Sequence, residues 1–106
     1  MARLSVTEVC GNSRVTREDG ARLREAVVAI WSDSAPVEVD FEGVAIASVS
    51  FFDEAFARLA LEHPLDVMKR RLNLVGLTAP DRRLLNSLLQ SRSRERASRR
   101  VADAGE

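Results

Sequence analysis

The segment from Val37 to Phe41 alternates between apolar and polar side chains. Its apolar positions hold β-branched or aromatic residues, which is typical of a strand with one buried face. We expect the strand to end near Gly43, after which a short apolar loop follows.

An amphipathic helix is predicted directly after this strand. Its apolar residues recur at helical spacing on one face: Phe52, Ala55, Phe56, Leu59 and Ala60. Ser50 is the expected N-cap, with Asp53 three residues later, so the helix should begin at Phe51. It should end at His63-Pro64, because proline disfavours helical backbone in the residue before it.

The remaining segments predict two further strands and two further helices. Arg3–Cys10 and Arg71–Leu77 alternate in the manner of strands, and a turn at residues 11–13 follows the first of them. Thr16 should cap a helix over Arg17–Trp31, and Thr78 a helix whose apolar stripe is Leu84, Leu85, Leu88 and Leu89. The segment between Pro64 and Arg71 is ambiguous.

This order of elements predicts an α/β fold, because strands alternate with helices along the chain. We expect a small mixed sheet of about four strands with three helices packed mainly on one face. Residues 1–90 should form the domain. Residues 91–106 should be an arginine-rich, flexible C-terminal tail, either a frayed helix or disordered, since large apolar residues are almost absent there.

Composition narrows the classes of function. Hydrophobic residues make up 45% of the chain, and 16 Lys and Arg balance 16 Asp and Glu, so no global field favours nucleic acid or an anionic membrane. One cysteine and one histidine provide neither a disulfide nor a zinc-type ligand set, and we expect no metal or cofactor. Without a long apolar run, the expected location is the cytoplasm.

Several segments resemble the STAS domain of bacterial anti-sigma-factor antagonists, and still more closely the STAS-like family of small bacterial proteins of unknown function. The resemblance extends over roughly residues 5 to 90. The matching residues are Val39-Asp40-Phe41-Glu42-Gly43-Val44, then Ser50, Phe51, Asp53, Glu54 and Phe56, then Glu62-His63-Pro64, and upstream Gly11-Asn12, Thr16-Arg17, Ala21 and Leu23. In antagonist STAS domains, the residue at the position of Ser50 is the hydroxyl that a partner kinase phosphorylates, and the surface around it docks that kinase.

Ser50 therefore has two interpretations: an N-cap, or a phospho-acceptor on a docking surface. A phosphate there would add up to two negative charges at a helix start, although Asp53 and Glu54 would oppose it. Ser48 is the alternative acceptor. Phe51 is either an exposed binding anchor or a core residue, and Asp53, Glu54 and Arg58 should lie on the exposed face that binds the partner.

The other chemically capable residues have structural explanations. Asp40 should be solvated or ion-paired on the polar face of its strand, His63 should complement the end of its helix, and Cys10 should be a small buried apolar residue. No nucleophile is placed beside a base in the sequence, so we do not expect an enzyme.

The sequence thus favours a non-enzymatic protein-interaction module that binds a partner of the serine-kinase or anti-sigma ATPase type through residues 47–51 and the exposed face of the following helix. A phosphorylation-independent scaffold or sensor is the alternative. It would pair with itself, as a homodimer, or with another domain through a sheet edge or the leucine-rich helix. Nucleic-acid binding by the Arg92–Arg100 segment ranks below both, because no aromatic residues interleave with the arginines.

Overall fold

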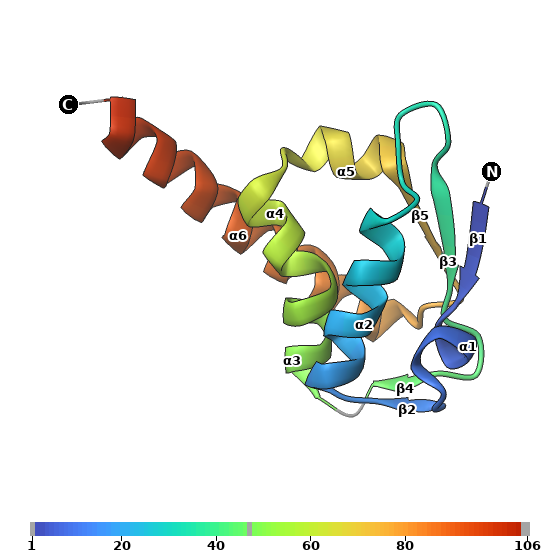
Figure 1. The fold of residues 1–106 in the computed structure, drawn as a ribbon. Helices are drawn as coiled ribbons and strands as arrows, with labels where there is room; N and C mark the ends of the chain where they lie inside the picture. Colours follow the sequence, from blue (N-terminus) through green and yellow to red (C-terminus); the bar gives the residue numbers. More distant parts are fainter. Residues whose placement is uncertain (1, 47, 105–106) are drawn as a thin grey trace.

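The strands form two small sheets, and every strand pair is parallel. The computed structural model describes residues 2–46 and 48–104 of the chain (Figure 1). The larger sheet has the order β1-β3-β5, with β1 at Ala2–Ser5, β3 at Val37–Asp40 and β5 at Leu72–Val75. The smaller sheet pairs β2 (Arg14–Val15) with β4 (Ala45–Ile46). The α/β class is confirmed, but a single mixed sheet of about four strands is wrong.

Helical segments occupy most of the connections between these strands, and a long helix follows the last strand, so the prediction of three helices is wrong. They are α1 (Val6–Cys10), α2 (Arg17–Val28), α3 (Val49–Phe52), η1 (Asp53–Ala57), α4 (Arg58–Glu62), α5 (Leu65–Arg71) and α6 (Ala79–Ala104). The segments α3, η1 and α4 follow one another without a break and form the predicted helix after the central strand. Its middle turn, η1, is a π-helical turn, a feature that is often found at functional sites.

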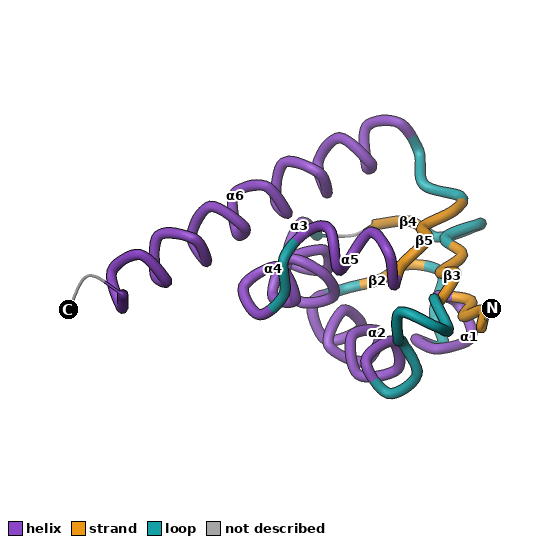
Figure 2. Tube along the Cα trace, turned by 90° about the horizontal axis from the view of Figure 1, so that it is seen from above, coloured by secondary structure: helices purple, strands orange, loops and turns teal. Residues whose placement is uncertain are grey.

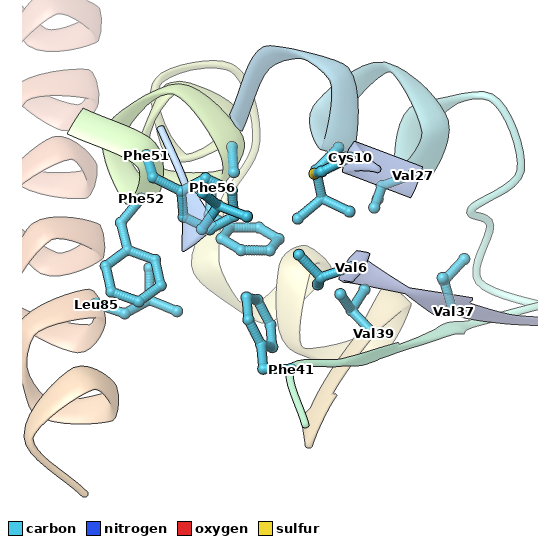
Figure 3. Close-up of a cluster of buried hydrophobic side chains, with 13 residues drawn as sticks. Val6, Cys10, Val27, Val37, Val39, Phe41, Phe51, Phe52, Phe56 and Leu85 are labelled. Atoms are coloured by element: carbon cyan, nitrogen blue, oxygen red, sulfur yellow. The ribbon is translucent and has the colours of Figure 1, made fainter. Parts of the chain in front are cut away.

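The helices pack against one face of the larger sheet. In β3, Val37 and Val39 are fully buried, whereas Glu38 and Asp40 on the opposite face are only partly buried. Figure 3 shows Val37, Val39 and Phe41 beneath the phenylalanines of α3 and η1, in a core that α6 also joins through Leu85. The predicted one-sided packing is therefore confirmed.

Two short segments differ from the predicted strands and loops. The predicted strand Arg3–Cys10 ends at Ser5, and Val6–Cys10 forms α1, which Gly11 terminates with a positive φ of 73°. The ambiguous segment after Pro64 is α5, which leads directly into β5. Only the first three of the eight residues in the predicted strand, Arg3–Ser5, are therefore in a strand.

The last helix does not end near Gln90. Helix α6 continues to Ala104, and Figures 1 and 2 show its C-terminal half extending away from the rest of the domain. Arg92 donates two hydrogen bonds to Asp53 Oδ1 at 3.2 and 3.1 Å, and Glu95 pairs with both Arg92 and Arg99. The two pairs of Glu95 are at helical spacing, and with the contact of Arg92 to η1 they support the helix where apolar residues no longer do.

Candidate functional site

The start of α3 carries two serine hydroxyls that contact each other. Ser48, with extended backbone, is the N-cap, and its Oγ accepts a hydrogen bond from the backbone N–H of Ser50 at 3.2 Å. Ser50 is the second residue of the helix, and its Oγ lies 2.6 Å from that of Ser48. The predicted cap at Ser50 is therefore wrong, because the capping role belongs to Ser48.

The exposed apolar residue beside these serines is Val49. Its exposed fraction is 51%, whereas Phe51 is fully buried. The Phe51 ring makes a T-shaped contact with Phe41, with 6.4 Å between ring centroids. The prediction of Phe51 as an exposed anchor is therefore wrong, and its alternative, a core residue, describes the structure. Ala47, the first residue of the predicted docking loop, lies outside the described residues.

Helix α2 packs against α3, and its Leu23 and Val27 belong to the same buried core as Phe51. The two helices approach closely at Gly20, where an added Cβ would lie 2.5 Å from the carbonyl oxygen of Phe51. Thr16 caps the start of α2 as predicted, with its backbone N–H donating to Asp19 Oδ2 at 3.0 Å. Figure 1 shows α2 and α3 beginning at the same end of the molecule.

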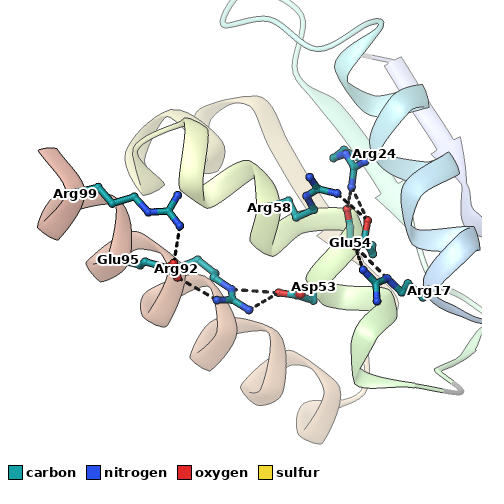
Figure 4. Close-up of polar contacts among 8 residues, drawn as sticks. All are labelled: Arg17, Arg24, Asp53, Glu54, Arg58, Arg92, Glu95 and Arg99. Atoms are coloured by element: carbon teal, nitrogen blue, oxygen red, sulfur yellow. Dashed lines mark hydrogen bonds and ion pairs between the residues drawn. The ribbon is translucent and has the colours of Figure 1, made fainter. Parts of the chain in front are cut away.

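One helical turn after Ser50, the carboxylate of Glu54 is surrounded by three arginines (Figure 4). Arg17 Nη2 lies 3.0 Å from Oε1, and the Nη1 atoms of Arg24 and Arg58 lie 3.2 and 3.3 Å from Oε2. Arg24 also donates to the backbone carbonyl of Glu54, within the π-helical turn. Glu54 is only 7% exposed, so its predicted place on the exposed face is wrong.

The arginines keep Glu54 ionised despite its burial. Burial alone would raise the pKa of this carboxyl, but hydrogen bonds from Arg24 and Arg58 outweigh it, and the net pKa lies below its usual value. Since three guanidinium groups face one carboxylate, the cluster carries a surplus of positive charge. We refer to Glu54, Arg17, Arg24 and Arg58 as the arginine cluster.

The second acid near Ser50 is also paired. Asp53 contacts Arg92 of α6, and about a third of each side chain is exposed, at 34% and 35% (Figure 4). Arg58 is 55% exposed and is the member of the predicted docking face that is most accessible. Both carboxylates that were expected to repel a phosphate on Ser50 are thus already neutralised by guanidinium groups.

The other predicted residues have structural roles. Asp40 accepts a backbone hydrogen bond from Glu42 at 2.9 Å and pairs with Arg3 at 2.8 Å, and both contacts lower the pKa of its carboxyl. The ring of His63 packs edge-on against Trp31, with centroids 5.1 Å apart. Cys10 is buried, which raises the pKa of its thiol.

Neither a metal-ligand group nor a membrane-spanning helix occurs among the described residues. Within residues 2–46 and 48–104, no group of three or more His, Cys, Asp or Glu side chains is arranged to hold a metal ion. No helix in the same ranges combines the length and the apolar character that crossing a membrane requires.

The class of protein is thus a small α/β domain with parallel strands, in which a pair of serine hydroxyls stands where the central helix begins. Residues 19–82, more than half of the chain, match the family model of a STAS-like domain of unknown function. The chain belongs to this STAS-like family, in agreement with its resemblance in sequence. No curated protein and no solved structure gave a significant match to it.

Sequence reasoning missed two contributors to this surface. Arg17 and Arg24 lie on α2, about thirty or more residues before Glu54, and only the tertiary fold brings them to it. Arg17 and Arg24 are seven residues apart, about two helical turns, and therefore lie on one face of α2. This spacing was the one local indication that they could act together. Val49 lies within the predicted docking loop, residues 47–51, but was not singled out, because the helix was expected to begin two residues later.

Proposed function

We propose that this STAS-like domain is a non-enzymatic protein-interaction module whose docking surface is the start of α3, and that phosphorylation of Ser50 lowers its affinity for the partner. The partner implied by the family resemblance is a serine kinase or an anti-sigma ATPase. The observation that carries the proposal is the placement of Ser50, which has no capping role, follows the exposed Val49 and precedes Glu54 of the arginine cluster by one helical turn.

The arginine cluster supports Ser50 as an acceptor. A phosphoserine carries up to two negative charges and accepts strong hydrogen bonds from guanidinium groups and from amides at a helix start. Because Glu54 is already paired with three arginines, the surplus charge one turn away is positive. Ser48 is the alternative acceptor, and its modification would also remove the cap of α3.

The affinity of the partner would fall because the docking surface changes its charge. An exposed valine beside partly exposed cations suits a partner surface with apolar and acidic groups. A phosphate at the centre of that contact would bring two like charges against the partner's acids, which costs binding free energy and slows association.

The test is a quantitative capture from native bacterial lysate with the wild type, Ser50→Ala and Ser50→Asp as parallel baits. A kinase-like partner should be retained by the wild type and Ser50→Ala and lost with Ser50→Asp. Ser87→Asp is the matched control, because Ser87 is an exposed serine on α6, remote in sequence from this surface. Phosphopeptide mapping of the native protein should locate phosphate on Ser50; equal capture by all baits, with no phosphate found there, would refute the switch.

A phosphorylation-independent scaffold is the second candidate, supported by the open edges of the larger sheet. In the order β1-β3-β5, both β1 and β5 are edge strands, which can pair with a strand of another chain. Sedimentation equilibrium distinguishes the two candidates. A dimer whose dissociation constant is the same for the wild type, Ser50→Ala and Ser50→Asp would favour the scaffold.

A further inference from the structure

A groove lies beside the edge strand β5, on the opposite side of that strand from β3. It has a volume of about 380 Å³ and is bordered by α5, β5 and α6, whose positions Figure 1 shows. The three consecutive residues Leu72, Asn73 and Leu74 all line it. Because successive side chains of a strand point to opposite faces, a groove that touches all three runs along the edge of the strand.

The backbone of β5 offers hydrogen-bonding groups to this groove. The carbonyl of Val75 accepts from the N–H of Phe41 at 2.9 Å, on the β3 side of the strand. In a parallel strand, the groups of the preceding residue point the other way, toward the open edge. The carbonyl of Leu74 does so, and it accepts a hydrogen bond from Arg82 Nη2 at 2.9 Å. An arginine side chain therefore occupies a position that a neighbouring strand could take.

The groove combines an apolar base with positive charge. Phe56 and Met68 are buried residues in its lining, and leucines from α5, β5 and α6 add to them. Its ionisable lining residues are Lys69 and Arg82, both exposed, and none of the lining residues is acidic. Lys69 precedes the start of β5 by three residues, whereas Arg82 contacts Leu74 near the other end of the strand. Cations thus flank both ends of β5.

We propose that this groove binds an extended peptide segment of a partner protein, with alternating apolar and acidic residues, as an added strand on β5. The backbone of the peptide would take the hydrogen bond of the Leu74 carbonyl, and Arg82 would turn to a carboxylate of the peptide. Apolar side chains would enter the base beside Phe56 and Met68, while Lys69 would pair with a second carboxylate. Main-chain hydrogen bonds provide affinity in such strand addition, and the side-chain pockets provide specificity.

The sequence of β3 supports this choice of partner, because β3 is the strand that already pairs with the other edge of β5. Strand β3 is Val-Glu-Val-Asp followed by Phe-Glu, an alternation of apolar and acidic residues, and it pairs with β5 in parallel register. A peptide in the groove would pair with the same strand, β5, from its open edge. There it would also meet the two cations Lys69 and Arg82. This site is separate from the proposed Ser50 surface and does not depend on it.

The test uses the intact chain and a fluorescein-labelled peptide, Val-Glu-Val-Asp-Phe-Glu, with binding followed by fluorescence anisotropy. Saturable binding is expected. Lys69→Glu and Arg82→Glu should each weaken it about three- to tenfold, the scale expected for reversing a charge at a contact edge. Arg83→Glu is the matched control, because Arg83 is an exposed neighbour on α6 that does not line the groove. This variant should bind the peptide with the affinity of the wild type. Ser50→Asp should also leave peptide binding unchanged.

Two further probes test the mode of binding. N-methylation removes a backbone N–H donor, and methylating alternate amides of the peptide gives two variants. In strand addition, only alternate residues bond to β5, so one variant should lose binding and the other should retain it. The peptide Val-Lys-Val-Lys-Phe-Lys should not bind. The proposal is overturned if the acidic peptide does not bind at millimolar concentration, if Arg83→Glu weakens it as much as Arg82→Glu, or if both methylated variants bind equally. Binding of octanoate that Arg82→Glu abolishes, without peptide binding, would make the groove a small-anion site instead.

Discussion

The side-chain oxygen of Ser48 lies 2.6 Å from that of Ser50 and also accepts a hydrogen bond from the Ser50 backbone N–H. One serine thus caps the helix and the other does not. Ser48→Ala should lower the free energy of unfolding by about 1 kcal/mol, the usual value of an N-cap. Ser50→Ala should change it by less than about 0.5 kcal/mol. Urea denaturation of both variants measures the difference, and equal losses would contradict the assigned cap.

Substitutions of Val49 and Phe51 should have different effects, the first on partner binding and the second on the stability of the fold. Phe51→Ala removes a fully buried ring and should cost about 3–5 kcal/mol of unfolding free energy. Val49→Ala truncates a side chain that is 51% exposed and should change stability by less than about 0.5 kcal/mol. In the capture experiment, Val49→Ala should nevertheless retain less partner than the wild type. Undiminished capture by this stably folded variant would remove Val49 from the docking surface.

The close approach of α2 and α3 makes a substitution at Gly20 costly. Alanine normally stabilises a helix relative to glycine, but a Cβ here would lie 2.5 Å from the Phe51 carbonyl and 3.1 Å from Glu54 Cβ. Gly20→Ala should therefore destabilise the domain by about 1–3 kcal/mol, as overpacking does. Glu25→Ala, at an exposed position of α2, is the control and should have little effect. Thermal unfolding of both variants tests the prediction, which a gain in stability for Gly20→Ala would contradict.

The elements that the sequence predicted correctly are those whose signals are local. The alternation over Val37–Asp40 and the Thr16–Asp19 capping pair require only neighbouring residues, and both occur in the structure. The leucine stripe of α6 is similar, since its spacing alone identifies the buried face. Such features could be predicted because the chain within a few residues determines them.

The errors arose where distant segments decide the outcome. Strands β2 and β4 have two residues each and exist only because they pair with each other. Phe51 lies outside the main apolar stripe, and it is buried against Phe41, ten residues upstream, in a core that α2 also joins. The choice between Ser48 and Ser50 as cap depended on the backbone of Ser48, which is extended, with φ of −153°. Between a frayed helix and disorder after Gln90, the structure has a helix, and Arg92 in it reaches Asp53 on η1.

The arginine cluster should make a measurable contribution to stability. Glu54→Gln keeps the shape of the side chain but removes the charge that three guanidinium groups share. We expect a loss of about 1–3 kcal/mol in unfolding free energy at pH 7, below the cost of breaking a fully buried pair, because Arg17 and Arg58 are largely exposed. Glu62→Gln is the matched control, since Glu62 is exposed on the same helix, and it should have little effect.

The same substitution should reduce the sensitivity of the domain to acid. The pKa of Glu54 in the folded state lies below its reference value of 4.5, so the folded state holds the ionised form more strongly than the unfolded state does. The resulting stabilisation is fully present above about pH 5 and is lost as the pH falls through the lowered pKa. Urea denaturation between pH 7 and pH 3 should therefore show the wild type losing more stability than Glu54→Gln. Both proteins should retain some dependence, because Asp33 and Asp40 also have lowered pKa values. Parallel curves for the two proteins would mean that Glu54 is not held ionised by its arginines.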